Sequence, residues 1–336
     1  MEHLSQNDPT TLGTITLKGR LGRGGMGAVY YGITEDLEAV AVKTILESLL
    51  DRGEVRARFT RELEALRTVQ SPHVATLLDS AAEGDDRPWL AIEFIRGLSL
   101  KEYVETSGTL TTEQVATLGL VVARALADIH AVGLLHRDLK PGNILMGREG
   151  PMVIDLGLVA FSDGPTDLTH TDLPMGTAVC MAPEQVNSPK HLTATVDVYA
   201  LGATLLYTLT KRFPFNERTT PLQLVKLSDP NAVPDLAGVP ESIGPLLAEM
   251  LAFDPAARPS VEDVHDRLMQ LLSTPVPVSI RNLAVSTFIR RDSDPEEIAP
   301  APRPGRKDLT EVAAPGTVIH ELAERLRNSY AATAKF

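Results

Sequence analysis

The chain has 336 residues, of which 43% are hydrophobic and 23% are charged, and its formal net charge at pH 7 is −12. This length and apolar share suit a globular protein with a sizeable core. The acidic balance excludes a nucleic-acid-binding surface as the main role. The single cysteine, Cys180, excludes an internal disulfide framework and suits a reducing compartment. We therefore expect a cytoplasmic protein.

The longest apolar segment of the sequence runs from Val115 to Leu135. It carries Arg124 and Asp128, which are costly inside a bilayer, so we expect a buried core helix and no membrane span. Thr111 and Gln114 have the spacing of a capping box and predict that this helix begins just after Thr111. The chain opens without the charged and apolar regions of a secretory signal, and we expect none.

Three glycines near the start of the chain have the spacing G-x-G-x-x-G, at Gly22, Gly24 and Gly27. This spacing lets backbone amides approach phosphate groups closely, both in dinucleotide-binding turns and in hairpins that cover a nucleotide. A dinucleotide-binding turn needs a helix directly after the glycines. The sequence instead continues with two strand-like runs, 29–31 and 39–43. The order of strand, glycines and strand favours the hairpin.

Lys43 ends the second of these runs, and a role in binding would require a carboxylate partner. The segment from Val55 to Val69 has apolar residues at helical spacing, and Glu62 lies within this apolar face. A carboxylate on a core-facing stripe is costly unless it is paired. We therefore expect an ion pair between Lys43 and Glu62. The alternative is that Glu62 lies at the rim of the helix, beside Arg58 or Arg61.

The stretch from His136 to Asn143 combines a carboxylate, an ammonium group and a carboxamide between two apolar segments. Asp138 can accept a hydroxyl proton, Lys140 can neutralise phosphate charge, and Asn143 can offer an oxygen to a hard cation. The apolar flanks predict an ordered loop between packed elements. These residue types in this order point to transfer of a charged group such as phosphate.

The sequence His136-Arg137-Asp138-Leu139-Lys140-Pro141-Gly142-Asn143 resembles the catalytic loop of protein kinases, H-R-D-L-x-x-x-N. Other segments of the chain are similar to motifs of this family and occur in the family's order. Before the loop these are the glycine run and Val40-Ala41-Val42-Lys43, and after it Asp155-Leu156-Gly157, Gly176 to Glu184, and Asp197 to Gly202. The chain resembles bacterial eukaryotic-like (Hanks-type) serine/threonine protein kinases from about Ile15 to Leu272.

This resemblance implies an α+β, bilobal fold with a small β-rich N-lobe, one main helix in that lobe, and a larger, mainly helical C-lobe. It also implies a buried ion pair between Glu184 and Arg258. The expected boundaries are 15–92 for the N-lobe, 93–97 for the hinge and 98–272 for the C-lobe.

The two ends of the chain fall outside this resemblance. Residues 1–14 are mostly polar, and we expect them to be disordered. Residues 273–336 are rich in proline and predict a flexible tail, with a possible short helix at 317–328. The sequence leaves open whether this tail docks on the kinase domain or on a partner.

The resemblance also implies a site for each component of the reaction, which is transfer of the ATP γ-phosphate to Ser or Thr hydroxyls of protein substrates. The catalytic residues would be Asp138, Lys140, Lys43 and Glu62. Mg²⁺, or Mn²⁺ as an alternative, would bind Asn143 and Asp155. The nucleotide would contact Leu21, Gly22, Gly24, Gly27, Val29, Ala41, Lys43, Glu93, Ile95 and Leu145, with Ile92 behind the adenine ring. The oligomeric state is left open.

Regulation by phosphorylation is implied by the same resemblance. Arg137 precedes the catalytic Asp138, so a phosphate on the activation segment would have a guanidinium partner. Thr169 and Thr171 match the phosphorylated pair of bacterial relatives, and the alternative is that they are solvated loop residues. Thr177 is expected to contact Asp138 and Lys140.

Two positions depart from the family pattern. Leu156 replaces the usual phenylalanine, and we expect it to fill an apolar position beside Leu66, Leu77 and His136. Cys180 stands where tyrosine is common, and we expect a small apolar filler there rather than a reactive thiol. These departures are the only support for a rival function, that of a pseudokinase scaffold that binds nucleotide and partners without catalysis.

Overall fold

The computed structural model describes residues 1–24, 27–45, 53–82, 88–156, 178–188, 191–217, 219–291 and 294–295, and gives only the backbone for 53–59. The chain divides into two units, one formed by Met1–Thr34 and Ala39–Pro295, the other by Glu35–Glu38 and Glu296–Phe336. All helices and strands below belong to the first unit.

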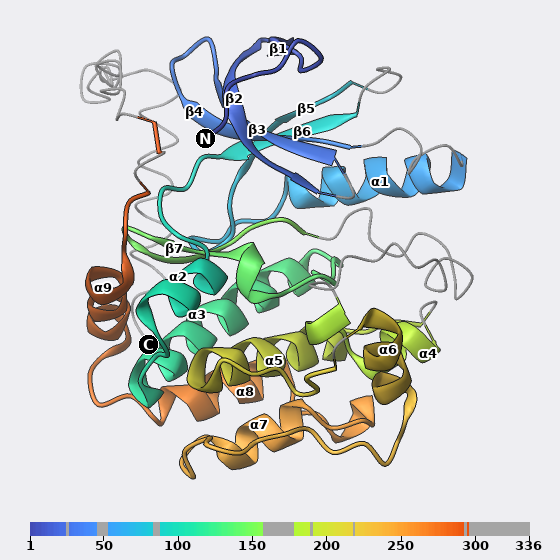
Figure 1. Cartoon of the computed structure of the whole chain (residues 1–336), viewed down its shortest axis with the longest axis vertical. Coiled ribbons are helices and arrows are strands. Elements are labelled where there is room, and N and C mark those ends of the chain that lie inside the picture. Colours follow the sequence, from blue (N-terminus) through green and yellow to red (C-terminus); the bar gives the residue numbers. More distant parts are fainter. Residues whose placement is uncertain are drawn as a thin grey trace, which may run out of the picture. The chain divides into compact units, whose positions relative to one another are not determined.

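The first part of the chain forms a six-stranded antiparallel sheet with the strand order β1-β2-β3-β4-β6-β5 (Figure 1). Ile15 and Leu17 are buried in β2 while Thr16 between them is exposed, which is the period of two that a half-buried strand requires. One helix, α1, follows β4. The bounds are β1 (Thr11–Leu12), β2 (Ile15–Gly24), β3 (Gly27–Ile33), β4 (Ala39–Thr44), α1 (Gly53–Leu66), β5 (Leu77–Ser80) and β6 (Trp89–Glu93).

The predicted hairpin is confirmed, because β2 and β3 pair directly and Gly24 lies opposite Gly27. Gly27 has a φ of +147°, and a Cβ built on it would lie 1.8 Å from the carbonyl oxygen of Thr44. No other residue fits there without moving β4. Strand therefore follows strand across the glycines, as the sequence predicted, and no dinucleotide-binding helix starts there.

The rest of the unit is mainly helical, as expected for a C-lobe. A two-stranded sheet, β7 (Ile144–Gly147) with β8 (Gly150–Val153), lies between α3 and α5 in the sequence. The helices are α2 (Leu100–Ser107), α3 (Thr112–Ala131), η2 (Pro141–Asn143), η3 (Ala178–Cys180), α4 (Pro183–Asn187), α5 (Thr195–Thr210), α6 (Thr220–Ser228), α7 (Gly244–Met250), η4 (Pro255–Ala257), α8 (Val261–Met269) and α9 (Val276–Thr287).

The helix α3 is the centre of this lobe. Its predicted capping box is present, since Gln114 N–H donates to Thr111 Oγ1 at 3.3 Å and Thr111 N–H donates to Gln114 Oε1 at 2.9 Å. Among the described helices, α3 is the one long and apolar enough to cross a membrane, yet 67% of its apolar window is buried inside the fold. It is a core helix, as predicted.

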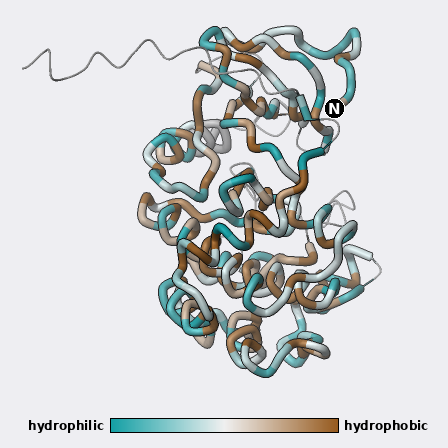
Figure 2. The backbone as a smooth tube through the Cα atoms, turned by 90° about the vertical axis from the view of Figure 1, so that its left-hand side faces the viewer, coloured by the Kyte–Doolittle hydropathy of each residue, from teal (hydrophilic) through white to brown (hydrophobic). Residues whose placement is uncertain are grey.

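Two apolar clusters form the core of the unit. The cluster in the sheet includes Val40, Val42 and Trp89. The cluster in the helical part is larger and includes Leu66 from α1 and Leu156. Figure 2 shows how hydrophobic and hydrophilic residues alternate along the chain, the pattern that lets each element bury one side. The larger cluster therefore ties α1, on the sheet side, to the helical lobe.

The N-terminal residues differ from the disordered segment that we expected. Glu2 exchanges two backbone hydrogen bonds with Arg20, both 2.9 Å long. Arg20 also forms ion pairs with Glu2 and Asp8, and Tyr30 Oη donates to Asp8 at 2.8 Å. The expectation is therefore wrong for this segment, because Arg20 and Tyr30 on the sheet provide it with partners that its own polar composition does not show.

The expected start of a flexible tail at residue 273 is also wrong. The helix α9 follows α8, and Leu283 and Thr287 on it are buried. The compact unit continues to Pro295. Prolines at 275 and 277 suggested a linker, but proline is favoured in the first turn of a helix, where it lies here. The possible helix at 317–328 lies outside the described residues.

Candidate active site

The loop from His136 to Asn143 is held by Asp197, a fully buried carboxylate in the first turn of α5. The carboxylate accepts the backbone N–H groups of His136 and Arg137, each at 2.8 Å, and lies 2.7 Å from His130 Nε2. Burial opposes its ionisation, but the contacts with His130 and His136 outweigh burial and lower the pKa of Asp197. The ionised carboxylate of Asp197 thus fixes the backbone at the start of the 136–143 loop.

Within the loop, Asp138 is the point on which the other polar side chains converge. Lys140 Nζ lies 2.7 and 2.9 Å from the two carboxylate oxygens of Asp138. Asn143 Nδ2 donates to the Asp138 carbonyl at 2.8 Å and to its carboxylate at 3.2 Å. Because the amide nitrogen of Asn143 is used in this way, its amide oxygen is the atom with which it could bind a cation.

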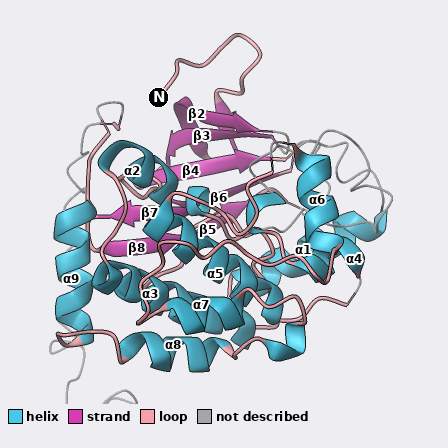
Figure 3. Cartoon of the chain, turned by 60° about the horizontal axis from the view of Figure 1, so that its bottom comes forward, coloured by secondary structure: helices cyan, strands magenta, loops and turns pink. Residues whose placement is uncertain are grey.

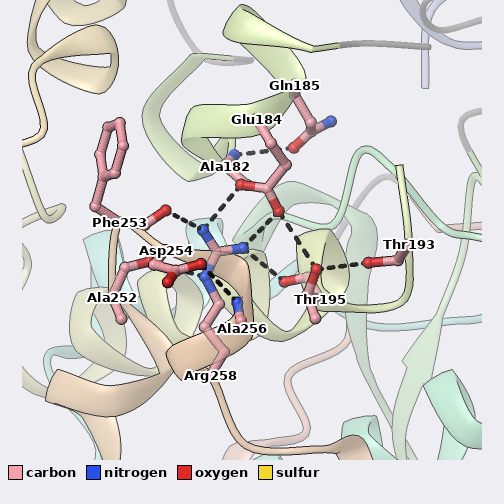
Figure 4. A network of polar contacts seen from close by, with 10 residues as sticks. All are labelled: Ala182, Glu184, Gln185, Thr193, Thr195, Ala252, Phe253, Asp254, Ala256 and Arg258. Atoms are coloured by element: carbon pink, nitrogen blue, oxygen red, sulfur yellow. Dashed lines mark hydrogen bonds and ion pairs between the residues drawn. The ribbon is translucent and has the colours of Figure 1, made fainter. Parts of the chain in front are cut away.

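A second buried network supports the loop from the side of α4, and Figure 4 shows it. Arg258 donates to both carboxylate oxygens of Glu184, at 2.6 and 2.8 Å, and its guanidinium stacks 4.9 Å from the ring centre of Tyr199. This confirms the predicted pair. The neighbouring Gln185 donates to the carbonyl oxygen of Arg137 at 2.9 Å, so α4 is tied to the loop directly.

A cavity lies between the sheet and the segment from Val153 to Leu156, and its walls are mainly apolar. Val29 pairs with Lys43, and Ala41 pairs with Ile92, so neighbouring strands bring these side chains together. The cavity is lined by Val29, Ala41, Lys43, Leu66, Ala75, Leu90, Ile92, Val153, Ile154, Asp155 and Leu156. The sequence placed five of these residues at the site, namely Val29, Ala41, Lys43, Ile92 and Asp155. It missed Leu90, which the strand period of two could have placed beside Ile92.

The ion pairs at this cavity differ from the predicted pair between Lys43 and Glu62. Lys43 is paired with Asp155, and Glu62 is paired with Arg137 at 2.8 Å. Glu62 does point inward from α1, with 12% of its side chain exposed, so the predicted orientation is correct and the predicted partner is wrong. Two cations compete for Glu62, and in this arrangement Arg137 holds it while Asp155 holds Lys43.

Two residues of this arrangement have unusual backbone angles. Arg137 and Asp155 both have a φ of 62°, in the left-handed region that residues other than glycine rarely adopt. Such angles cost free energy and persist where the surrounding contacts fix them. Arg137 is fixed by Asp197 and Gln185, which bond its N–H and carbonyl groups.

The remaining predicted nucleotide contacts are not among the residues that line this cavity. A Cβ on Gly22 or Gly24 would meet no atom within 4 Å, so the space beside β2 is open there. Leu145 lies on β7, and Glu93 ends β6. Among the described residues, no backbone hydrogen bond uses the Ile95 N–H. Leu21 lies on β2. The predicted regulatory residues Thr169, Thr171 and Thr177, and Gly157 of the metal-binding motif, lie outside the described residues.

The two departures from the family pattern are both buried. Leu156 is 8% exposed and belongs to the apolar cluster that contains Leu66 and against which Leu77 packs, so it fills an apolar position. Cys180 is 3% exposed, and burial raises the pKa of its thiol to about 12. This agrees with the predicted role of a small apolar filler.

A protein kinase domain is recognised over residues 15–269. The chain belongs to the protein kinase family. It is 35% identical to the serine/threonine-protein kinase AfsK of Streptomyces griseus over 98% of this chain and 42% of that protein. It is 37% identical to AfsK of Streptomyces coelicolor over 80% of this chain and 33% of that protein. The chain thus spans less than half the length of these kinases.

The family fold is also seen in solved structures. The kinase domain of Mycobacterium tuberculosis PknI aligns with 80% of this chain and 99% of its own, with a TM-score of 0.62 and 23% sequence identity. The bilobal kinase fold predicted from the sequence is therefore confirmed.

Proposed function

We propose that this chain is an ATP- and Mg²⁺-dependent kinase that phosphorylates Ser or Thr hydroxyls of proteins. The observation that carries the proposal is the Asp138 carboxylate, which accepts hydrogen bonds from Lys140 and Asn143 on a loop that buried Asp197 anchors. A carboxylate fixed in this way can orient an acceptor hydroxyl and accept its proton. Because the substrate is ATP, the reaction belongs in the cytoplasm.

Each remaining residue has a role that its chemistry supports. Lys43 would hold the α- and β-phosphates, and Lys140 would stabilise the γ-phosphoryl group as it moves. The hairpin of β2 and β3 would cover the phosphates, where the open space beside Gly22 and Gly24 leaves room for them. Positioning and electrostatics account for most of the rate in this type of reaction.

The donors at the site fit Mg²⁺. Asp155 offers carboxylate oxygens and Asn143 an amide oxygen, and these are the hard ligands that Mg²⁺ takes when phosphates complete its shell. Bound there, the cation supplies charge that offsets the charge developing on the phosphates during transfer. Mn²⁺ takes similar ligands.

The observed ion pairs support a proposal about regulation. The carboxylate of Asp155 is occupied by Lys43, and Arg137 is occupied by Glu62. Phosphate on Thr169 or Thr171 would compete with Glu62 for Arg137, since a dianionic phosphate pairs more strongly with guanidinium than a carboxylate does. Glu62 could then take Lys43, and Asp155 would become available to the cation. This exchange links autophosphorylation to activity.

The test is transfer of labelled γ-phosphate from Mg-ATP to the chain itself and to a generic protein acceptor. Lys43→Met and Asp138→Asn should each lower the rate of phosphate transfer by a factor of roughly 10³ or more. Lys101→Met, at an exposed lysine of α2 paired with Glu105, is the matched control and should transfer like the wild type. Asp138→Asn with unimpaired transfer would remove Asp138 from its proposed role.

The same samples separate the two remaining questions. Mass spectrometry of the active protein should find phosphate on Thr169 or Thr171, and active protein with both residues unmodified contradicts the proposed regulation. A wild-type chain that binds ATP but transfers no phosphate would favour the pseudokinase scaffold instead.

A further inference from the structure

The segment after α8 runs along the helical lobe toward the hinge between the lobes. It includes α9, which lies beside β7 and β8 in two different views (Figures 1 and 3). Gln114, at the start of α3, donates to Ser286 on α9 at 3.1 Å. A Cβ on Gly150, the first residue of β8, would lie 3.1 Å from Ile280 Cγ2. The helix thus supports β7, the strand that carries the predicted nucleotide contact Leu145.

The residue after α9, Phe288, reaches the end of the hinge. Gly97 has a φ of +131°, and a Cβ built on it would lie 2.3 Å from the Met146 carbonyl oxygen and 3.6 Å from Phe288 Cδ2. Gly97 is therefore enclosed between β7 and the C-terminal segment. Directly after it, Leu98 accepts the Met146 N–H at 2.8 Å. Phe288 therefore lies beside the last residue of the hinge, Gly97.

Arg291 forms a second contact with the same region, an ion pair with Glu102 on α2. Oε2 of Glu102 accepts this bond and also the N–H and Oγ–H of Ser99, each at 2.7 Å. Ser99 caps α2 and forms a backbone bridge with Leu145. Oε2 of Glu102 therefore links Arg291 to Ser99. Ser99 in turn lies two residues after the hinge and pairs with Leu145, the predicted nucleotide contact on β7.

The ion pair between Arg291 and Glu102 is expected to add little to the free energy of folding. The side chains of Arg291 and Glu102 are 29% and 44% exposed, and exposed ion pairs contribute little to folding. The position of the pair points to a role in nucleotide binding. By restraining Ser99, just after the hinge, the pair restrains the part of the chain where the adenine edge is expected to bind.

We propose that Arg291 and Phe288 are positioning residues for nucleotide binding, which hold the hinge exit and the Ser99 cap in the geometry that ATP requires. The inference rests on the proposed kinase function. It makes the segment from 288 to 291 part of the nucleotide site, although neither residue contacts the nucleotide itself.

The experiment measures the Kd of a non-hydrolysable ATP analogue with Mg²⁺, and KM for ATP and kcat with a generic acceptor, on the full chain. Arg291→Ala and Phe288→Leu should each raise Kd and KM by roughly three- to tenfold, with kcat changed less than about twofold, as expected when one contact outside the reacting groups is lost. Arg281→Ala, at an exposed position of α9, also removes one arginine charge from the segment after α8 and should leave both constants unchanged.

A double variant sharpens the test. Glu102→Gln should also raise Kd, and combining it with Arg291→Ala should add little, because both changes break the same contact. Wild-type Kd and KM in Arg291→Ala would overturn the inference while leaving the kinase function intact, even if the melting temperature falls. A wild-type chain that binds no ATP would overturn both.

Discussion

Cys180 lies at the end of η3, where Met181 and Ala182 beside it are also buried. The pKa of about 12 reduces the thiolate fraction at pH 8 by roughly a thousandfold relative to an unperturbed thiol. We predict that a maleimide labels the folded protein slowly and the guanidinium-unfolded protein rapidly at pH 8. The chain has no other cysteine, so the label reports this site alone.

Cys180→Ser serves as the control and should take up no label in either state. Prompt labelling of the folded wild type would show that the thiol is accessible and that the tyrosine-to-cysteine departure has a chemical role. Slow labelling supports the interpretation drawn from the sequence, that Cys180 fills space beside the catalytic loop.

Buried and exposed ion pairs between elements should differ in their contribution to stability. Arg258 has a fully buried side chain and bonds Glu184 on α4, whereas Arg267 on α8 pairs with Glu249 on α7 at the surface. Removing one partner of a buried pair costs about 3–5 kcal/mol, and removing one from an exposed pair costs about 0–1 kcal/mol. We therefore predict that Arg258→Ala lowers the free energy of unfolding far more than Arg267→Ala.

Urea unfolding monitored by the fluorescence of the single tryptophan, Trp89, and by circular dichroism would measure both variants. Arg258→Lys keeps the charge but loses the two parallel bonds, so an intermediate value is expected. Equal losses in Arg258→Ala and Arg267→Ala would mean that the network of Figure 4 does not hold α4.

At the scale of elements, the sequence predicted what depends on local patterns. The capping box of α3 and the glycine hairpin are local, and both were found. The helix α9 was missed although Val276, Ile280 and Leu283 have helical spacing, because the prolines around its first turn dominated the interpretation. The order of residues 1–14 was missed for another reason: their partners lie on strands that fold over them only in the tertiary structure.

At the scale of the whole molecule, partner choice across the cavity could not be predicted from the sequence. The helical pattern correctly placed Glu62 on the inner face of α1, but two cations from different parts of the chain, Lys43 and Arg137, are available to it. Which cation it takes depends on where Asp155 lies, and therefore on how the two lobes and the following segment are arranged. The orientation of Glu62 on its helix can be predicted from the local sequence, whereas its ion-pair partner depends on the complete fold.

Acid should destabilise the molecule in two steps, each from a group whose pKa is lowered by folding. Burial lowers the pKa of His73, so its contribution is complete above about pH 6.5, its unfolded value, and is lost as the pH falls below that. Asp197 also has a lowered pKa, despite burial, because of His130 and His136. Its contribution is complete above about pH 4 and is lost as the pH falls through the folded value.

The measurement is the melting temperature of the full chain between pH 8 and pH 3. His73→Gln should flatten the loss between about pH 6.5 and 5 while keeping the steeper loss below pH 4, because the glutamine cannot be protonated and Asp197 is unchanged. Asp197→Asn should lower the melting temperature at pH 7 and weaken its dependence on pH below 4. A His73→Gln protein with the wild-type slope between pH 6.5 and 5 would assign that step to another group.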